Sequence, residues 1–398
     1  MEELSDRLGK SHRPLTVVLG TSGSGKSSLV KAGLVPYLRQ QEEKNESAQR
    51  WYILDPIRPG KSPFAELARA VLPVANSNLI SRLAEVSFMD RRFAEILDPK
   101  SKPEAASQNL TSSGDRKQPS SDNGDQSFDA TKLAERWNKA TPEAKLLLVL
   151  DYFEQLQDFF HLQSEEQAQL SSLHDEINNT LKPLTENLQH QPESFIELMT
   201  AWSQNHPKTK LLLVIDQFEE LITMSQDDRD SGEQSDSQEQ VQQKQWQRFL
   251  ILLRMTLAKY RRQLHVIVTL RSDFEPRFLN SALKAQWKDA RFPVRAMNSD
   301  ELRDAIEGPA LKQALYFEPP ELVGKLIDEV GQMPGALPLL SFTLSELYIK
   351  LFDRWMKDRS TDRALRIKDY EELGGVAGAL TRRATQEYDN LVKDFGEE

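Results

Sequence analysis

A glycine-rich loop near the N-terminus carries the residues best suited to chemistry. Residues 20–27 read Gly-Thr-Ser-Gly-Ser-Gly-Lys-Ser, which fits the pattern G-x-x-x-x-G-K-[ST]. Glycines let the backbone turn tightly enough for its N–H groups to face phosphate oxygens, where Lys26 would neutralise charge and Ser27 would ligate Mg²⁺. An apolar run before the loop and a helical stretch after it favour this interpretation over a Gly/Ser linker. The predicted phosphate-binding residues are Gly20, Thr21, Ser22, Gly23, Ser24, Gly25, Lys26, Ser27 and Ser28.

Two acidic residues compete for the position that would hold Mg²⁺ together with Ser27. A loop of this kind needs an acid at the end of a neighbouring strand. Asp216 ends the run LLLVI, and Asp151 ends the run LLLVL. Asp216 has the shorter path to the next apolar run, and Glu219 and Glu220 follow it. The sequence therefore favours Asp216 as the metal ligand and treats Asp151 as the end of an additional strand.

Hydrolysis would require a base and a group that stabilises developing charge. Gln217 cannot act as a base, so Glu219 is the better candidate and Glu220 the second. A solvated pair of acids is the alternative for both. Arg271 directly follows an apolar run and would bring its guanidinium to the γ-phosphate, whereas an ion pair with Asp273 is the competing interpretation.

The elements that must position these residues alternate between apolar runs and helical stretches. Short apolar runs, typical of strands, lie at 15–19, 51–54, 211–215, 264–270 and 292–295. Helical spacing lies between them at 26–40, 64–72 and 246–261. This alternation predicts an α/β fold with a parallel sheet, because strands covered by helices on both faces read as continuous apolar runs.

The pattern turns helical after residue 297. Asn298 with Glu301 resembles a helix N-terminus. A proline pair precedes a second helix that ends near Gly331, and residues 339–356 have helical spacing. We therefore predict an α/β domain over 1–297, a helical domain over 298–360 and the start of a further domain over 361–398.

Two segments of the chain repeat each other. KLLLVLDYFE at 145–154 and KLLLVIDQFE at 210–219 share a lysine, an aspartate and the pair Phe-Glu, and a tryptophan and a proline match upstream. Two similar apolar strands would not explain the shared polar and aromatic residues. We therefore predict a duplicated helix–strand unit over 128–160 and 193–225.

Composition excludes several classes of protein. The chain has 398 residues, a formal net charge of −10 and no cysteine. This excludes disulfides, thiolate metal sites and cysteine nucleophiles, argues against non-specific nucleic-acid binding, and fits a cytoplasmic protein. No apolar run is long enough for a transmembrane helix. Only 38% of the residues are hydrophobic, and the polar segments 101–127 and 225–245, expected to be disordered or solvated, carry much of the polarity.

Four segments together resemble the STAND NTPases, which are signal-transduction ATPases with numerous domains. They read GTSGSGKSSLV, LLLVIDQFEELIT, VIVTLRSDF and MPGALPLL. The resemblance covers residues 12–385 and is closest to the bacterial "novel STAND" branch, related to the NACHT and NB-ARC ATPases. In it, Thr269–Arg271 match the T-x-R sensor, and Gly335 with Pro338 match the G-x-P motif of the lid. The resemblance implies that Pro338 packs on the adenine of a bound nucleotide.

The resemblance also implies an architecture and a function. The architecture is an ASCE-type P-loop NTPase domain, with helices on both faces of a parallel sheet, followed by a helical lid and a partial winged-helix domain. The implied function is a switch that binds ATP or ADP with Mg²⁺ and hydrolyses ATP slowly. ADP would hold the lid closed, and exchange for ATP would open it and permit self-association. Effector and sensor domains are expected outside this chain, and no membrane or nucleic-acid partner is expected.

Two other functions stay open. A nucleotide-binding scaffold with little or no hydrolysis is favoured by Gln217, which directly follows the favoured Mg²⁺ acid. A small-molecule kinase or a DNA-remodelling motor is the third possibility. The GALPLL segment disfavours the kinase, and the acidic charge disfavours the motor.

Overall fold

The computed structural model describes most of the chain in two compact units. The described residues are 2–9, 13–44, 49–97, 129–160, 162–224, 236–331, 333 and 335–395. The first unit consists of Met1–Trp51, Ile215–Glu219 and His265–Glu398, and the second of Tyr52–Val214 and Glu220–Leu264. The predicted polar segment 101–127 lies outside the described residues, as do residues 225–235 of the other polar segment.

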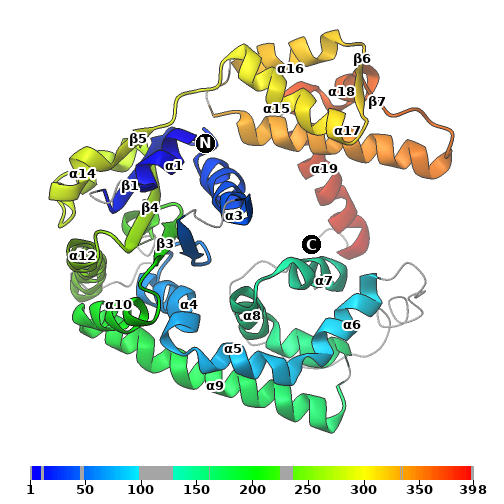
Figure 1. Ribbon diagram of the computed structural model, residues 1–398. Helices are drawn as coiled ribbons and strands as arrows, with labels where there is room; N and C mark the ends of the chain where they lie inside the picture. Colours follow the sequence, from blue (N-terminus) through cyan, green and yellow to red (C-terminus); the bar gives the residue numbers. More distant parts are fainter. Residues whose placement is uncertain are drawn as a thin grey trace. The chain divides into compact units, whose positions relative to one another are not determined.

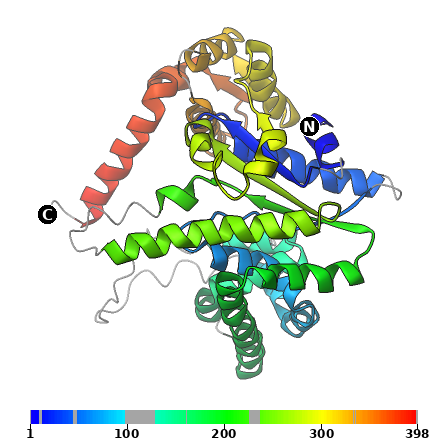
Figure 2. The same ribbon diagram turned by 90° about the vertical axis from the view of Figure 1, so that its left-hand side faces the viewer.

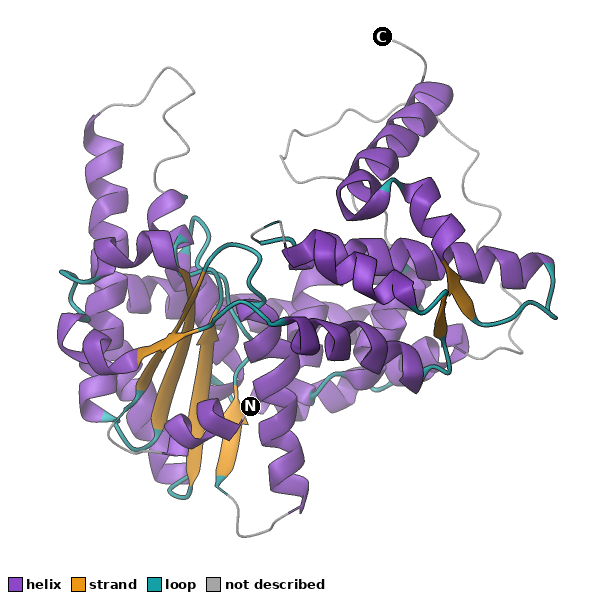
Figure 3. Cartoon of the chain, turned by 90° about the horizontal axis from the view of Figure 1, so that it is seen from above, coloured by secondary structure: helices purple, strands orange, loops and turns teal. Residues whose placement is uncertain are grey.

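A five-stranded sheet has the strand order β2-β3-β4-β1-β5. The strands, drawn as orange arrows in Figure 3, are β1 (Leu15–Gly20), β2 (Arg50–Ile53), β3 (Thr209–Ile215), β4 (Leu264–Arg271) and β5 (Arg291–Pro293). Strand β1 runs parallel to β4, with Leu15 opposite Val266 and Gly20 opposite Arg271, and parallel to β5 on its other side. Every residue of β1 is buried, as expected for a strand covered on both faces. The predicted α/β fold is confirmed, and the last strand begins one residue earlier than predicted.

The helices in the rest of the first unit's sheet region lie before β1, after β1 and after β4 in the sequence. They are α1 (Glu2–Gly9), α2 (Lys26–Ser28), a π-helical turn (Leu29–Leu34), α3 (Val35–Lys44), a 3₁₀ turn (Ser272–Phe274), α13 (Glu275–Phe278) and α14 (Lys284–Ala290). The helix predicted over 26–40 is present, with the π-helical turn between its two α-helical parts. Such turns are rare, occur mostly inside α-helices and are frequent at functional sites.

The C-terminal part of the first unit is mainly helical. It contains α15 (Ser299–Lys312), β6 (Tyr316–Glu318), α16 (Glu321–Gly331), α17 (Leu337–Lys357), β7 (Ala364–Arg366), α18 (Ile367–Leu373) and α19 (Gly375–Phe395). The predicted N-terminus at Asn298 is confirmed, because its side chain accepts the Glu301 N–H at 2.9 Å and its own N–H bonds to the Glu301 carboxylate at 3.0 Å. Leu326, Leu347 and Val376 belong to one core here, so residues on both sides of position 360 pack together. The domain division at 360 stays a prediction.

The second unit is built mostly from helices. They are α4 (Pro63–Ala75), α5 (Asn78–Arg82), a 3₁₀ turn (Leu83–Val86), α6 (Phe88–Leu97), α7 (Ala130–Lys139), α8 (Pro142–Phe160), α9 (Ser164–His190), α10 (Glu193–Asn205), α11 (Glu220–Thr223) and α12 (Asp236–Lys259). Helix α9 contacts α4, α5 and α8 (Figure 1). Helices α10 and α12 lie side by side (Figure 2). Helix α12 begins at Asp236, so residues 236–245 are helical rather than the irregular segment predicted there.

The predicted helix–strand duplication is wrong for its first copy. Residues 145–154 lie within α8, whereas 210–215 lie in β3. The first copy is buried periodically, at Leu146, Leu148 and Val149, in a helical core that also contains Trp137. The second copy is buried without interruption. A short apolar run fits a buried helix as well as a buried strand, so packing partners decided between them.

Candidate functional site

The loop after β1 is folded around the ammonium of Lys26. Gly23 and Gly25 have φ angles of 69° and 81°, in the left-handed region that favours glycine. Lys26 Nζ donates to the carbonyls of Gly20 at 3.0 Å and Thr21 at 2.7 Å. Burial is the largest influence on Lys26 and lowers its pKa, so the loop holds a lysine whose charge is incompletely solvated.

One hydroxyl of this loop has no partner. Ser24 Oγ is enclosed and makes no hydrogen bond with any described residue. A buried polar atom without a partner is uncommon and costs free energy. An enclosed hydroxyl beside a cationic lysine and two left-handed glycines is a donor set that suits an anion, so the loop fits a phosphate group.

A buried carboxylate lies where β3 ends. The Asp216 side chain is 1% exposed. Its Oδ1 accepts hydrogen bonds from Ser27 Oγ and from Thr269 Oγ1, each at 2.6 Å, and its Oδ2 lies 3.1 Å from Lys31 Nζ. Burial disfavours the ionised form, but the bonds from Ser27, Thr269 and Lys31 outweigh it and lower the pKa of Asp216. Asp216 is therefore an ionised carboxylate beside the hydroxyl of Ser27, and this pair of hard oxygen donors fits Mg²⁺.

Thr269 ties the end of β4 to the turn after β3. The residue is 1% exposed. Its hydroxyl donates to Asp216 and accepts the N–H of Gln217 at 3.0 Å. Gln217 has a φ of 54°, which is uncommon outside glycine. The Phe218 N–H donates to the Thr269 carbonyl at 2.9 Å. These bonds fix the backbone that carries Glu219.

Glu219 and Arg271 face the same part of the first unit. A Glu219 carboxylate oxygen accepts the Arg271 backbone N–H at 3.3 Å. The charges of Glu219 and Arg271 both act on Lys26, the first raising and the second lowering its pKa. The Arg271 guanidinium bonds to Asp273 at 2.8 and 3.2 Å and lies 5.1 Å from the centre of the Phe274 ring. The ion pair with Asp273, the competing interpretation from the sequence, is present.

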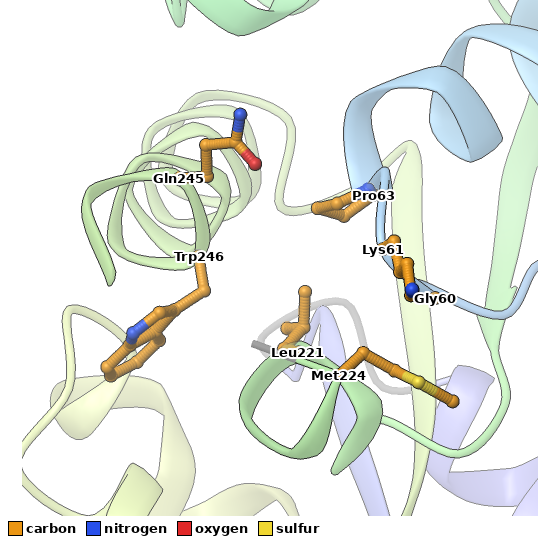
Figure 4. Close-up of a pocket in the computed structure, with 7 residues that line it drawn as sticks. All are labelled: Gly60, Lys61, Pro63, Leu221, Met224, Gln245 and Trp246. Carbon is orange, nitrogen blue, oxygen red and sulfur yellow. The ribbon is translucent and has the colours of Figure 1, made fainter. Parts of the chain in front are cut away.

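Glu220 makes its contact in the second unit. Its Oε2 accepts the Gly60 N–H at 3.1 Å, and Gly60 has a φ of 51°. A small cavity lies beside this turn, and Figure 4 shows Trp246 on one side of it and Pro63 on the other. Leu221, Met224 and Gln245 also line the cavity. The carboxylate of Glu220 thus supports a turn, and its role as second base stays a prediction.

Asp151, the alternative metal ligand, lies in α8 rather than at the end of a strand. Its carboxylate forms an ion pair with Arg69 of α4. Both residues line a cavity of about 420 Å³ in the second unit, together with Glu66 and Arg136. Burial raises the pKa of Glu66. Asp151 therefore has an ion-pair role within the second unit.

The segment before α17 approaches the glycine-rich loop closely. Gly335 has a φ of 80°, and a methyl group added there would lie 2.6 Å from the Ser22 carbonyl oxygen. A methyl group added at Gly23 would overlap the Gly335 carbonyl. Two glycines are therefore required where these backbones meet. Pro338, in the first turn of α17, is exposed.

Sequence reasoning missed Lys31. It is four positions after Ser27, and that spacing places two side chains on the same face of a helix. This spacing was the available signal, but nothing in the sequence shows that Lys31 rather than Lys26 pairs with Asp216. Among the described ranges, no three His, Cys, Asp or Glu side chains are grouped to hold a metal, and none of the helices could span a membrane.

Comparison with known proteins gives one positive result. A family model described as "Novel STAND NTPase 1" matches residues 1–185 and 163–397. No curated protein matches the chain. The two matches together extend over nearly the whole sequence, including the glycine-rich loop, Asp216 and Thr269. With a P-loop-like α/β fold and a donor set that fits a phosphate and a divalent cation, the chain belongs to the Novel STAND NTPase 1 family.

Proposed function

We propose that the chain is an ATP-dependent switch that binds ATP or ADP with Mg²⁺ in the first unit. The observation that carries this proposal is the hydrogen-bonded group of Ser27, Asp216 and Thr269 beside the glycine-rich loop. Residues 20–28 would surround the phosphates, and Lys26 would neutralise part of their charge. Family membership supports a nucleotide-binding switch in general terms.

Each residue has a distinct chemical task in this proposal. The backbone N–H groups of the loop bind phosphate oxygens, and Ser27 and Asp216 hold the metal ion. A metal ion held there would supply positive charge that neutralises the phosphates. Glu219 accepts a proton from the attacking water, because it is half-buried and its backbone is fixed through Thr269. Arg271 would stabilise charge only after its guanidinium leaves Asp273.

Switching would act on the contact between Gly335 and the phosphate-binding loop. The two backbones meet so closely that movement of Ser22 or Gly23 around a γ-phosphate would disturb the contact. A nucleotide shifts an equilibrium only by binding two states with different affinity. We propose that ADP favours the closed contact, that ATP favours its opening, and that the open form self-associates.

A nucleotide-binding scaffold with little hydrolysis is the second candidate. The observation that favours it is the double hydrogen bond between Arg271 and Asp273, which occupies the guanidinium. Gln217 after the metal-binding acid agrees with it. In this alternative, ATP and ADP bind at the same loop but turnover is absent.

The test compares three proteins: wild type, Asp216→Asn and the matched control Asp151→Asn. ATP turnover, calorimetric ADP binding and particle mass with ADP or a non-hydrolysable ATP analogue are measured. We expect Asp216→Asn to lose Mg²⁺-dependent turnover and Asp151→Asn to retain it. Turnover that is absent from wild type while ADP binds would favour the scaffold, and absence of nucleotide binding would refute both functions.

A further inference from the structure

Lys31 forms an ion pair with the candidate metal-binding carboxylate of Asp216. Its Nζ lies 3.1 Å from Asp216 Oδ2, and its side chain is 39% exposed while that of Asp216 is 1% exposed. The lysine of the loop pattern, Lys26, donates instead to two backbone carbonyls. The ammonium of an exposed side chain thus compensates the charge of a buried acid.

The two oxygens of Asp216 have different partners. Oδ1 receives two hydroxyl hydrogen bonds, from Ser27 and Thr269. Neutral hydroxyls stabilise a carboxylate but bring no opposite charge, and an uncompensated buried charge costs several kcal/mol. A positive charge lies at Oδ2 and comes from the ammonium of Lys31. Removal of Lys31 would take away the ammonium that contacts Oδ2 and leave the two hydroxyl donors at Oδ1.

The local backbone explains how Lys31 reaches the site. Lys31 lies inside the π-helical turn Leu29–Leu34, which directly follows the short helix that carries Lys26 and Ser27. Lys31 and Ser27 occupy the same face at a spacing of i and i+4. The same helical segment therefore supplies both the hydroxyl and the ammonium that contact Asp216.

We propose that Lys31 is a placeholder for the metal ion: its ammonium neutralises Asp216 while no divalent cation is present and withdraws when Mg²⁺ binds with nucleotide. This inference rests on the proposed function of the site. It adds that the Lys31 ammonium competes with Mg²⁺ for Asp216. Because Lys31 is exposed on one side, its side chain can move to solvent at little cost. Lys31 thereby keeps the empty site folded and lowers its apparent affinity for Mg²⁺.

The first measurement tests the ion pair without any ligand. Thermal unfolding in EDTA is compared for wild type, Lys31→Met, Asp216→Asn and the double variant. Methionine keeps the length of the lysine stem and removes the charge. We expect Lys31→Met to lower the unfolding temperature more in the wild-type background than in the Asp216→Asn background. Equal effects in both backgrounds would overturn the proposal.

The second measurement tests competition. At a fixed ADP concentration, MgCl₂ is titrated and the concentration for half of the maximal thermal shift is recorded. We expect Lys31→Met to lower that concentration about tenfold, since a charged hydrogen bond contributes about 1.5–3 kcal/mol and about 1.4 kcal/mol is tenfold. Lys31→Arg, which keeps the charge, should not lower it.

The matched control is Lys350→Met, which removes a 2.8 Å ion pair with Glu372 outside the site. It should leave the half-saturating MgCl₂ concentration unchanged. An unchanged or increased concentration for Lys31→Met, in a protein that binds ADP, overturns the placeholder role. Absence of ADP binding in wild type would instead refute the proposed function, and the measurement in EDTA would then decide the ion pair alone.

Discussion

Replacing Thr269 by valine tests whether one hydroxyl organises the candidate site. Valine has nearly the same shape but cannot donate to Asp216 or accept from the Gln217 N–H, and the structure gives these bonds lengths of 2.6 and 3.0 Å. A bond to a charged group contributes about 1.5–3 kcal/mol, and an unsatisfied buried donor costs about 1–3 kcal/mol. Because Asp216 keeps Ser27 and Lys31, we expect a loss of about 3 kcal/mol in the free energy of unfolding.

The assay is thermal and urea unfolding of the protein without nucleotide. At roughly 2–4 °C per kcal/mol for a unit of 150–250 residues, the unfolding temperature should fall by about 6–12 °C. Thr269→Ser keeps the hydroxyl and should recover most of the loss.

Thr343→Val is the matched control for this prediction. Thr343 is also fully buried, but its hydroxyl donates to the Leu339 carbonyl one helical turn earlier, at 2.9 Å. That carbonyl can remain bonded within the helix, so we expect a loss of about 1 kcal/mol or less. A loss for Thr269→Val no larger than that for Thr343→Val would show that the Thr269 hydroxyl does not organise Asp216.

Three further predictions concern other parts of the protein. Gly335→Ala should lower the unfolding temperature and reduce the thermal shift with ADP, because Gly335 has a φ of 80° and a methyl group there would clash with the Ser22 carbonyl. The control is Gly324→Ala, where a methyl group would have nothing within 4 Å, and it should stabilise the protein by about 0.5–1 kcal/mol. Lys26→Met should abolish calorimetric ADP binding without destabilising the ligand-free protein, since burial lowers the pKa of this lysine; retained binding would contradict the site. Burial beside Phe153 also lowers the pKa of His174, so the unfolded state binds more protons and stability should fall as pH drops below about 6.5. Urea unfolding at pH 7.5 and pH 5.5 should show a smaller loss for His174→Gln than for wild type, and equal losses would exclude this contribution.

Local pattern was enough to predict the parts of the molecule that depend on neighbouring residues. The glycine-rich loop, the apolar runs of β1, β3 and β4, and the cap at Asn298 each have a signal within a few positions. The preference for Asp216 over Asp151 also came from chain order, and the structure places Asp216 beside Ser27. These features are local because backbone conformation and burial period are set over short stretches.

Tertiary packing decided what the sequence left ambiguous. KLLLVLDYFE and KLLLVIDQFE have nearly the same side chains, yet the first is a helix in a helical core and the second a strand covered on both faces. From the sequence, Arg271 was compatible with a phosphate partner or with Asp273, and the structure shows the bond to Asp273. No signal in the sequence indicated the partner of Lys31, which in the structure is Asp216 at the end of β3. The sequence by itself determined the glycine-rich loop and the α/β order. Only the tertiary structure decided which apolar run became a strand and which lysine neutralised the acid, because both depend on groups far apart in the chain.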